Sequence, residues 1–191
     1  MCKTKSTFVI FLFIVSFSFS NENKTKEFKG FFDFSYDESK DKIFLQVDKL
    51  DHEFLYVGSL ASGVGSNDIG LDRGQLGSEK LVKFIKKGNK LLLVEPNLYY
   101  RAETKNISEK KSVEQAFAKS VIFGFEIMET NDNHYLIDFT PFLMFDRHGV
   151  AKTLRDSKQG SYKVDKTKSA IEINNTKAFP NNVEFEALLT F

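Results

Sequence analysis

Alternation of hydrophobic and polar residues runs through the first part of the chain and predicts β-strands. In residues 30–37, GFFDFSYD, the aromatic side chains of Phe32, Phe34 and Tyr36 alternate with polar ones, which is the pattern of a strand with one buried face. The same alternation resumes in residues 42–49 after a polar turn. The two segments therefore predict a β-hairpin.

Further segments extend the predicted sheet towards the middle of the chain. Residues 53–61, EFLYVGSLA, are apolar enough to predict a strand buried on both faces. Residues 79–96 predict a second hairpin, whose reversal at residues 87–89 contains a Gly-Asn pair suited to a tight turn. Residues 97–103 are expected to continue the sheet.

One principal helix is predicted over about residues 112–121. Ser112 followed by Gln115 fits a capping box, and apolar residues then recur at helical spacing. The rest of the second half predicts mainly strands, over residues 121–129, 134–145 (stopped near Pro141), 161–173 and 181–191, with a short helix around residues 151–155. The predicted fold class is α+β, mainly β: an antiparallel sheet or sandwich-like domain.

The first twenty residues have the pattern of an export signal. Two lysines precede an apolar run over residues 8–19, and Ser18 and Ser20 are small residues at the spacing that signal peptidase requires. The run is too short for a comfortable bilayer span, so we expect residues 1–20 to be a signal peptide that is cleaved before Asn21. An uncleaved anchor is the alternative. The mature protein is expected in the periplasm, the cell envelope or the medium, without a stable membrane span.

The composition of the remaining residues limits the number of domains and the kinds of site that the chain can form. Residues 21–29 are polar and predict a disordered lead-in, and residues 28–191 predict a single domain because no internal repeat or long linker divides them. The single cysteine, Cys2, excludes an intrachain disulfide framework and a multi-cysteine zinc site. A formal net charge of +1 gives no sign of nucleic-acid binding.

Residues 63–77, GVGSNDIGLDRGQLG, are the most unusual stretch, with Asp68, Asp72 and Arg73 set among glycines. Phosphate binding is disfavoured, because neither the third glycine of G-x-G-x-x-G nor the Gly-Lys-Ser/Thr of a P-loop is present. Calcium is a weaker alternative, since oxygen ligands are present but the spacing of an EF-hand is not. The favoured interpretation is a long structured loop, whose arginine pairs with a carboxylate or with an adjacent domain.

The histidines offer little catalytic chemistry. His52-Glu53 begins like a zincin motif, but Tyr56 stands where H-E-x-x-H requires its second histidine. His134 and His148 are isolated in the sequence and are interpreted as surface or structural residues. Ser-His-Asp sites assemble in space from distant residues, so an independent hydrolase stays as one alternative function. No catalytic, cofactor-binding or metal-binding residue is assigned.

Several segments together resemble one protein family. They are residues 62–84, 97–102, 113–127, 136–143 and 177–191. The chain looks like the N-terminal domain of unknown function in large exported bacterial zinc metalloproteases of the met-zincin type, over nearly all of residues 28–191. The most specific parts are the GLDRGQ and FPNNVEFE stretches.

In that family a catalytic domain with an extended H-E-x-x-H motif follows, and no residue of this chain matches that motif. The resemblance therefore implies a non-catalytic accessory domain, as a fragment or stand-alone remnant, with zinc only in the catalytic domain. The glycine density of the loop, the apolar strand predicted before it and the lone Arg73 lead to the hypothesis that the loop docks on such a catalytic domain, in cis or in trans, through Asp68, Gly70, Asp72, Arg73 and Gly74. The main alternative is an envelope module that binds a peptide or glycan, for which we expect clustered surface aromatics.

Overall fold

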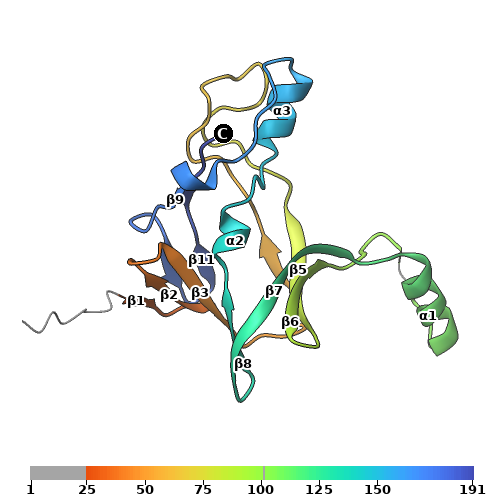
Figure 1. Cartoon of the computed structure of the whole chain (residues 1–191). Coiled ribbons are helices and arrows are strands. Elements are labelled where there is room, and N and C mark those ends of the chain that lie inside the picture. The colour runs from red at the N-terminus through yellow and green to blue at the C-terminus, as the bar shows by residue number, and fades with distance from the viewer. Residues whose placement is uncertain (1–24, 101) are drawn as a thin grey trace, which may run out of the picture.

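Eight antiparallel strands form one curled sheet in the computed structural model, which describes residues 25–100 and 102–191. The strands lie in the order β1-β2-β3-β8-β7-β6-β5-β4 (Figure 1). Their bounds are Thr25–Phe28 (β1), Asp33–Asp37 (β2), Lys42–Val47 (β3), Phe54–Tyr56 (β4), Lys80–Lys87 (β5), Lys90–Glu95 (β6), Ser120–Asn131 (β7) and His134–Asp138 (β8). The prediction of a mainly β fold built on an antiparallel sheet is confirmed.

Both predicted hairpins are present. β2 pairs with β3, and β5 pairs with β6 through a turn of two residues, because Lys87 lies opposite Lys90. Gly88 occupies this turn with a φ of 58°, a conformation that glycine adopts without steric cost. Alternation in the sequence was therefore a sound guide to the strands that pack against the core.

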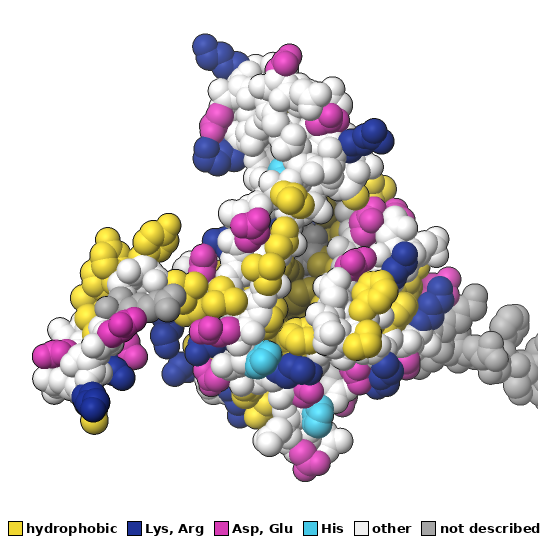
Figure 2. Space-filling model, turned by 180° about the vertical axis from the view of Figure 1, so that it is seen from behind, with side chains coloured by type: hydrophobic (Ala, Val, Ile, Leu, Met, Phe, Trp, Pro, Cys, Tyr) yellow, Lys and Arg dark blue, Asp and Glu magenta, His cyan; other side chains and the backbone are white. Residues whose placement is uncertain are grey.

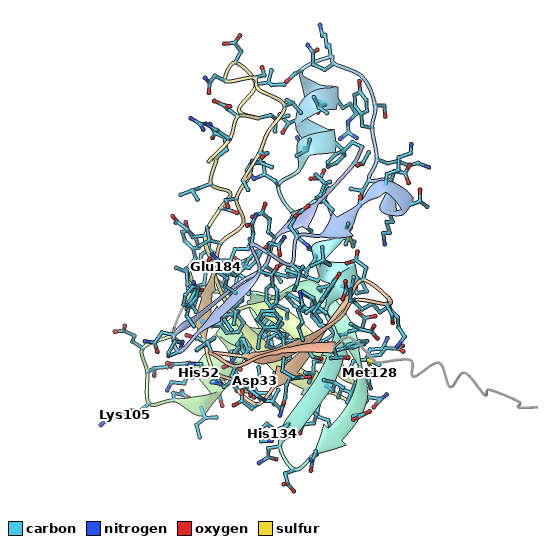
Figure 3. All side chains as sticks on the ribbon, turned by 90° about the vertical axis from the view of Figure 1, so that its left-hand side faces the viewer. Asp33, His52, Lys105, Met128, His134 and Glu184 are labelled. Carbon is cyan, nitrogen blue, oxygen red and sulfur yellow. The ribbon has the colours of Figure 1, made fainter. Side chains whose placement is uncertain are left out.

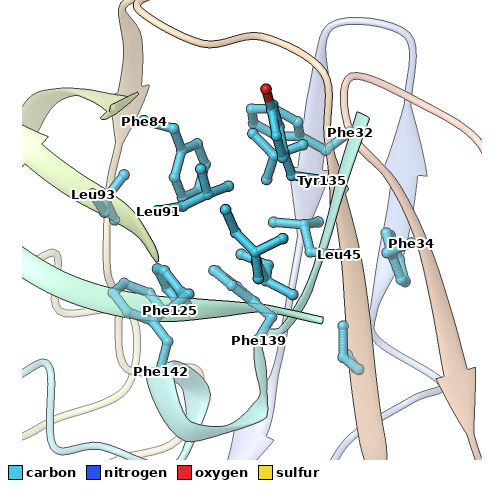
Figure 4. Close-up of a cluster of buried hydrophobic side chains, with 14 of the residues drawn as sticks. Phe32, Phe34, Leu45, Phe84, Leu91, Leu93, Phe125, Tyr135, Phe139 and Phe142 are labelled. Atoms are coloured by element: carbon cyan, nitrogen blue, oxygen red, sulfur yellow. The ribbon is translucent and has the colours of Figure 1, made fainter. Parts of the chain in front are cut away.

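The core fills the concave side of the sheet. Alternate residues of neighbouring strands point inwards, as Figure 4 shows for Leu45, Leu91 and Phe125. Phe32, just before β2, packs edge-on against Phe84 of β5 with ring centroids 5.8 Å apart. The first hairpin thus reaches the far end of the sheet, and the curl encloses one hydrophobic core.

Two small ladders from the end of the chain cover the core. β10 (Lys177–Phe179) pairs with β11 (Asn182–Glu184), and β9 (Ala170–Ile171) pairs with β12 (Ala187–Leu188). Between them, Phe185 packs against Phe34 and Phe139, with centroids 4.9 and 5.1 Å apart. The single strand predicted over residues 181–191 is thus two short strands, of which β11 pairs with β10 and β12 pairs with β9.

Other strand predictions were wrong at the ends of the sheet. β4 covers only three residues of the predicted strand 53–61, and Leu55 is 66% exposed, because β4 is an edge strand rather than a central one. In the predicted continuation over residues 97–103, the described residues 97–100 and 102–103 do not form a strand of the sheet. In residues 161–173 only the short 3-10 helix η1 (Lys166–Lys168) and β9 form.

The principal helix lies earlier than predicted. α1 covers Ile107–Ala116 and begins at Asn106, whose side chain accepts a hydrogen bond from the Ser108 N–H at 2.9 Å. Residues from Ser120 onwards instead pair with β6 as part of β7, so the predicted helix over 112–121 is wrong at both ends. α1 has no buried residue and projects from the body (Figure 1).

Two short helices follow β8. α2 (Thr140–Leu143) carries Pro141 in its first turn, where a missing N–H costs nothing, so the strand predicted to reach residue 145 ends at Asp138. α3 (Val150–Asp156) confirms the short helix predicted around residues 151–155. At both helices a preceding aspartate satisfies a backbone donor. Asp138, the last residue of β8, accepts from Thr140 N–H at 3.0 Å, and Asp146 accepts from Val150 N–H at 2.8 Å.

The N-terminal predictions fall mostly outside the described residues. The signal peptide over residues 1–20 and the first part of the lead-in are not described. Within the lead-in, Thr25–Phe28 forms β1 and pairs with β2, so this part is an ordered edge strand in the structure. In the described residues, 25–100 and 102–191, we find no helix whose length and apolar character would let it cross a membrane.

Candidate functional site

The glycine-rich loop, residues 57–79, joins β4 to β5 and is held in shape by its own backbone. Gly77 N–H donates to Gly58 O at 2.7 Å, and Gly74 N–H donates to Leu60 O at 2.7 Å. Further out, Val64 N–H donates to Leu71 O at 2.9 Å. These bonds make the loop an irregular, two-armed extension that rises beside α3 (Figure 1).

The candidate docking residues lie on the outer part of this loop. Gly70 and Gly74 have φ values of 67° and 75°, the left-handed region that favours glycine. The Asp72 carboxylate accepts a hydrogen bond from the Arg73 N–H at 2.8 Å. Asp68 and Arg73 are exposed, and neither forms an ion pair with any residue of the described ranges.

A buried residue anchors the loop and was missed by sequence reasoning. Leu71 is only 1% exposed although it stands between Gly70 and Asp72 in a polar stretch. The carbonyl of Leu71 also lies so close to Gly63 that a Cβ there would approach its oxygen to 2.2 Å. The glycines of this loop therefore serve two purposes: some allow positive φ, and Gly63 allows the two arms to meet.

A cavity of about 100 Å³ opens at the base of the loop. Its wall combines residues that are far apart in the sequence: Tyr56, Gly58, Gly77, Lys80, Arg147 and His148. Lys80 Nζ is paired with Glu95 Oε2 at 2.7 Å. The sheet brings Tyr56 and Lys80 together because they are opposite one another in the β4–β5 ladder.

Arg147 is held in the cavity wall by aromatic rings. The Cζ atom of its guanidinium lies 4.2, 4.4 and 5.1 Å from the ring centroids of Phe142, Phe145 and Phe123, and its Nε donates to Phe142 O at 3.5 Å. Burial lowers the pKa of Arg147, and the nearby Tyr56 acts against that shift. Burial likewise raises the pKa of Tyr56, and Arg147 opposes the rise.

His148 contributes an unpaired nitrogen to the same wall. Its Nδ1 atom is buried and has no hydrogen-bond partner among the residues that the structure describes. Sequence reasoning interpreted this histidine as a surface or structural residue, because nothing in its own neighbourhood pointed to Tyr56 or Gly77. The only local signal for a site here was the adjacent pair Arg147-His148, which follows aromatic residues in the sequence.

The other histidines do not join this cavity. His52 and His134 are exposed and lie in the lower half of the molecule in Figure 3, away from the loop. His52 precedes β4, a strand, whereas a zincin pair needs a helix. Ser78 lines the cavity beside His148, but no carboxylate does, so a Ser-His-Asp arrangement is not assembled there. Within the described ranges, no three His, Cys, Asp or Glu side chains group as a metal site.

A second surface feature surrounds α1. We call residues 97–119 without Arg101 the aromatic arm. Tyr100 and Phe117 stack at a centroid distance of 3.9 Å, while Tyr99 is 95% exposed. Figure 2 shows hydrophobic side chains gathered on the projecting arm. A cleft of about 330 Å³ lies where the arm meets the sheet, with Tyr99, Glu79 and Glu95 in its wall.

These features describe a β-sheet domain with an ordered surface loop, a small cationic cavity and an exposed arm. Comparison with known protein families gives a match: the family model described as Domain of unknown function (DUF5117) matches residues 74–191. The chain belongs to that family. No curated protein and no solved structure matches it. The matched region begins at Gly74, so it contains Arg147 and His148 but not Asp68, Gly70, Asp72 or Arg73.

Proposed function

We propose that this chain is a non-catalytic accessory domain of an exported bacterial zinc metalloprotease, and that its glycine-rich loop docks on the catalytic domain in cis or in trans. The observation that carries the proposal is the loop itself. Its backbone is fixed by internal hydrogen bonds, while the exposed Arg73 has no counter-ion in the described part of the chain. Zinc would be held by the catalytic domain alone.

The physical state of the loop suits a binding role. A segment that is already ordered loses little conformational entropy when it binds. Arginine is among the residues that contribute most to protein interfaces, and an arginine without an ion-pair partner among the described residues is available to a carboxylate of another domain. The resemblance of the GLDRGQ stretch to the metalloprotease family supports the proposal that this other domain is a metalloprotease catalytic domain.

The arrangement of the termini agrees with docking in cis. Figure 1 marks the C-terminal end in the upper part of the molecule, where the glycine-rich loop and α3 also lie. The last residues are tied there, because Asp165 N–H donates to Thr190 O at 2.7 Å. A polypeptide that continued beyond Phe191 would therefore emerge at the same end as Arg73.

The test replaces Arg73 in the natural polypeptide that carries the catalytic domain, or in this chain if the two are separate. Arg73→Ala should lower protease activity or weaken binding to the catalytic domain, while the melting temperature of this domain stays the same. Arg155→Ala is the matched control, because Arg155 is also exposed and belongs to neighbouring α3. Unchanged activity and unchanged binding in Arg73→Ala would refute the docking role.

A second candidate function is supported by the aromatic arm. Exposed aromatic rings beside a cleft are typical of surfaces that bind peptides or sugars, and the exposed Tyr99 lines the 330 Å³ cleft. In an envelope binding module, Tyr99→Ala would abolish retention on peptidoglycan or on an immobilised peptide library, whereas Arg73→Ala would not. The opposite pattern would favour the accessory domain.

A further inference from the structure

The cavity below the glycine-rich loop contains a positive charge that the described chain does not neutralise. The guanidinium of Arg147 is partly buried, lies over three phenylalanine rings and forms no ion pair with a carboxylate of the described residues. The other cation of the wall, Lys80, is already paired with Glu95 at 2.7 Å. A partly desolvated charge is costly unless an anion accompanies it.

Hydrogen-bonding capacity is also unused in the cavity. His148 Nδ1 is buried without a partner among the described residues, and buried polar atoms are normally satisfied. The phenol of Tyr56 lines the same space and makes no hydrogen bond to a described residue. Two side chains from separate segments therefore offer polar atoms to a space that already holds an unpaired guanidinium.

We propose that this cavity binds a single carboxylate group, held by Arg147 with His148 and Tyr56 as hydrogen-bonding partners. A planar guanidinium fork matches a carboxylate in two parallel hydrogen bonds. A volume of about 100 Å³ is smaller than the roughly 150 Å³ cavity that admits benzene, so it takes a carboxylate with a short stem. One unpaired cation balances one negative charge better than the two charges of a phosphate.

The carboxylate can belong to a small free acid or to the end or side chain of a peptide. Gly58 and Gly77 form part of the cavity wall and are joined by a hydrogen bond of 2.7 Å, so their amides report on a bound group. This site differs from the docking loop, whose candidate residues lie on the outer part. Loss of one role by substitution therefore leaves the other measurable.

The first experiment is an NMR titration of the ¹⁵N-labelled protein with acetate, followed at the amides of Gly58 and Gly77. We expect saturable shifts with a dissociation constant of about 1–10 mM. Acetamide, an uncharged molecule of the same shape, should give no saturable shift. Equal binding of acetate and acetamide, or no saturation with acetate, would overturn the proposal. Binding of inorganic phosphate in preference to acetate would overturn the assignment to a carboxylate.

The second experiment tests the residue. Arg147→Met places an unbranched apolar side chain beside the phenylalanine rings but removes the charge, and it should weaken acetate binding by at least about tenfold. Arg155→Met is the control and should bind as the wild type does. Equal acetate affinity in Arg147→Met would refute the role of Arg147. If Arg147→Met melts early, Arg147→Lys replaces it, and full retention of binding would refute the bidentate contact.

To separate the two sources of the carboxylate, the same amides are followed with a short peptide that ends in a free carboxylate and with its C-terminally amidated form. Binding of the free peptide at least about tenfold more tightly than acetate, with loss in the amidated form, would assign the site to a peptide terminus. Acetate binding with no gain from the peptide would assign it to a small free acid. Both results support a carboxylate site.

Discussion

Gly63→Ala tests whether the glycine-rich loop is a built structure rather than a passive connection. A Cβ atom at residue 63 would lie 2.2 Å from Leu71 O and 2.8 Å from the carbonyl carbons of Leu71 and Asp72. Ordinary contacts of this kind begin near 3.4 Å. The two arms of the loop must therefore separate by about 1 Å, since the obstacle is backbone and cannot rotate away.

The expected cost follows from what that separation breaks. The hydrogen bond from Val64 N–H to Leu71 O, 2.9 Å long, contributes about 0.5–1.5 kcal/mol. Overpacking adds about 1–3 kcal/mol, and the burial of Leu71 is weakened in addition. We expect a loss of about 2–4 kcal/mol in the free energy of unfolding, which moves the urea midpoint by about 1–2 M for a typical denaturant slope.

The matched control is Gly70→Ala in the same loop. No atom lies within 4 Å of a Cβ at Gly70, so the only penalty is the positive φ of 67°, which costs about 1–2 kcal/mol for a residue with a side chain. Urea denaturation of both variants, with hydrogen exchange at Val64 and Leu71, provides the comparison. The reasoning is refuted if Gly63→Ala is no less stable than Gly70→Ala, or if its loop amides keep wild-type protection.

Two further predictions concern the core and the alkaline stability. Phe84→Ala should lower the free energy of unfolding by about 3–5 kcal/mol, because Phe84 is 2% exposed and contacts Phe32. The control Leu55→Ala, at an exposed site, should change this free energy by less than about 0.5 kcal/mol. Equal losses in the two variants would contradict the assignment of the core. Burial, together with the hydrogen bond to Asp41, raises the pKa of Tyr36 to about 12 from 10.0. The unfolded tyrosine thus ionises first, and the stability that Tyr36 contributes is complete below pH 10 and lost between pH 10 and about 12. Urea midpoints across this range should fall more steeply for the wild type than for Tyr36→Phe, and parallel profiles would contradict the shift.

The sheet was predictable wherever one face of a strand packs against the core. The alternation of Phe34 and Tyr36 with polar residues sets which face of β2 is buried, and Gly88-Asn89 fixes the turn of the second hairpin. β4 misled because its apolar residues lie at a sheet edge, where Leu55 faces solvent. Hydrophobicity alone does not say whether a strand is central or at an edge.

The helix shows a different limit of sequence reasoning. Apolar residues at helical spacing, such as Val113 and Ala116, predict a face that packs on the core, yet α1 buries none of its residues. Asn106 starts the helix through a local hydrogen bond. Because Ser120 pairs with β6 as the first residue of β7, the helix must end before it. A long-range strand contact thus decided the boundary.

The two candidate sites also differ in how far the sequence could predict them. The glycine-rich loop could be predicted as a structured loop because its glycines and charges lie close together in the sequence; its docking role stays a proposal. The cavity could not, because Tyr56, Gly77 and Arg147 come together only through the β4–β5 ladder and the packing of Arg147 on phenylalanine rings. No local pattern marks a site whose parts lie about ninety residues apart.

Association with a zinc metalloprotease is the central claim, and affinity purification of the native protein tests it most directly. An antibody against residues 25–191 would recover the protein from envelope and medium fractions, and mass spectrometry would identify every polypeptide in the product. The account predicts a zinc metalloprotease sequence with H-E-x-x-H, either in the same polypeptide or in a stoichiometric partner that is lost in Arg73→Ala. A chain no larger than about 22 kDa recovered without any metalloprotease sequence would contradict it.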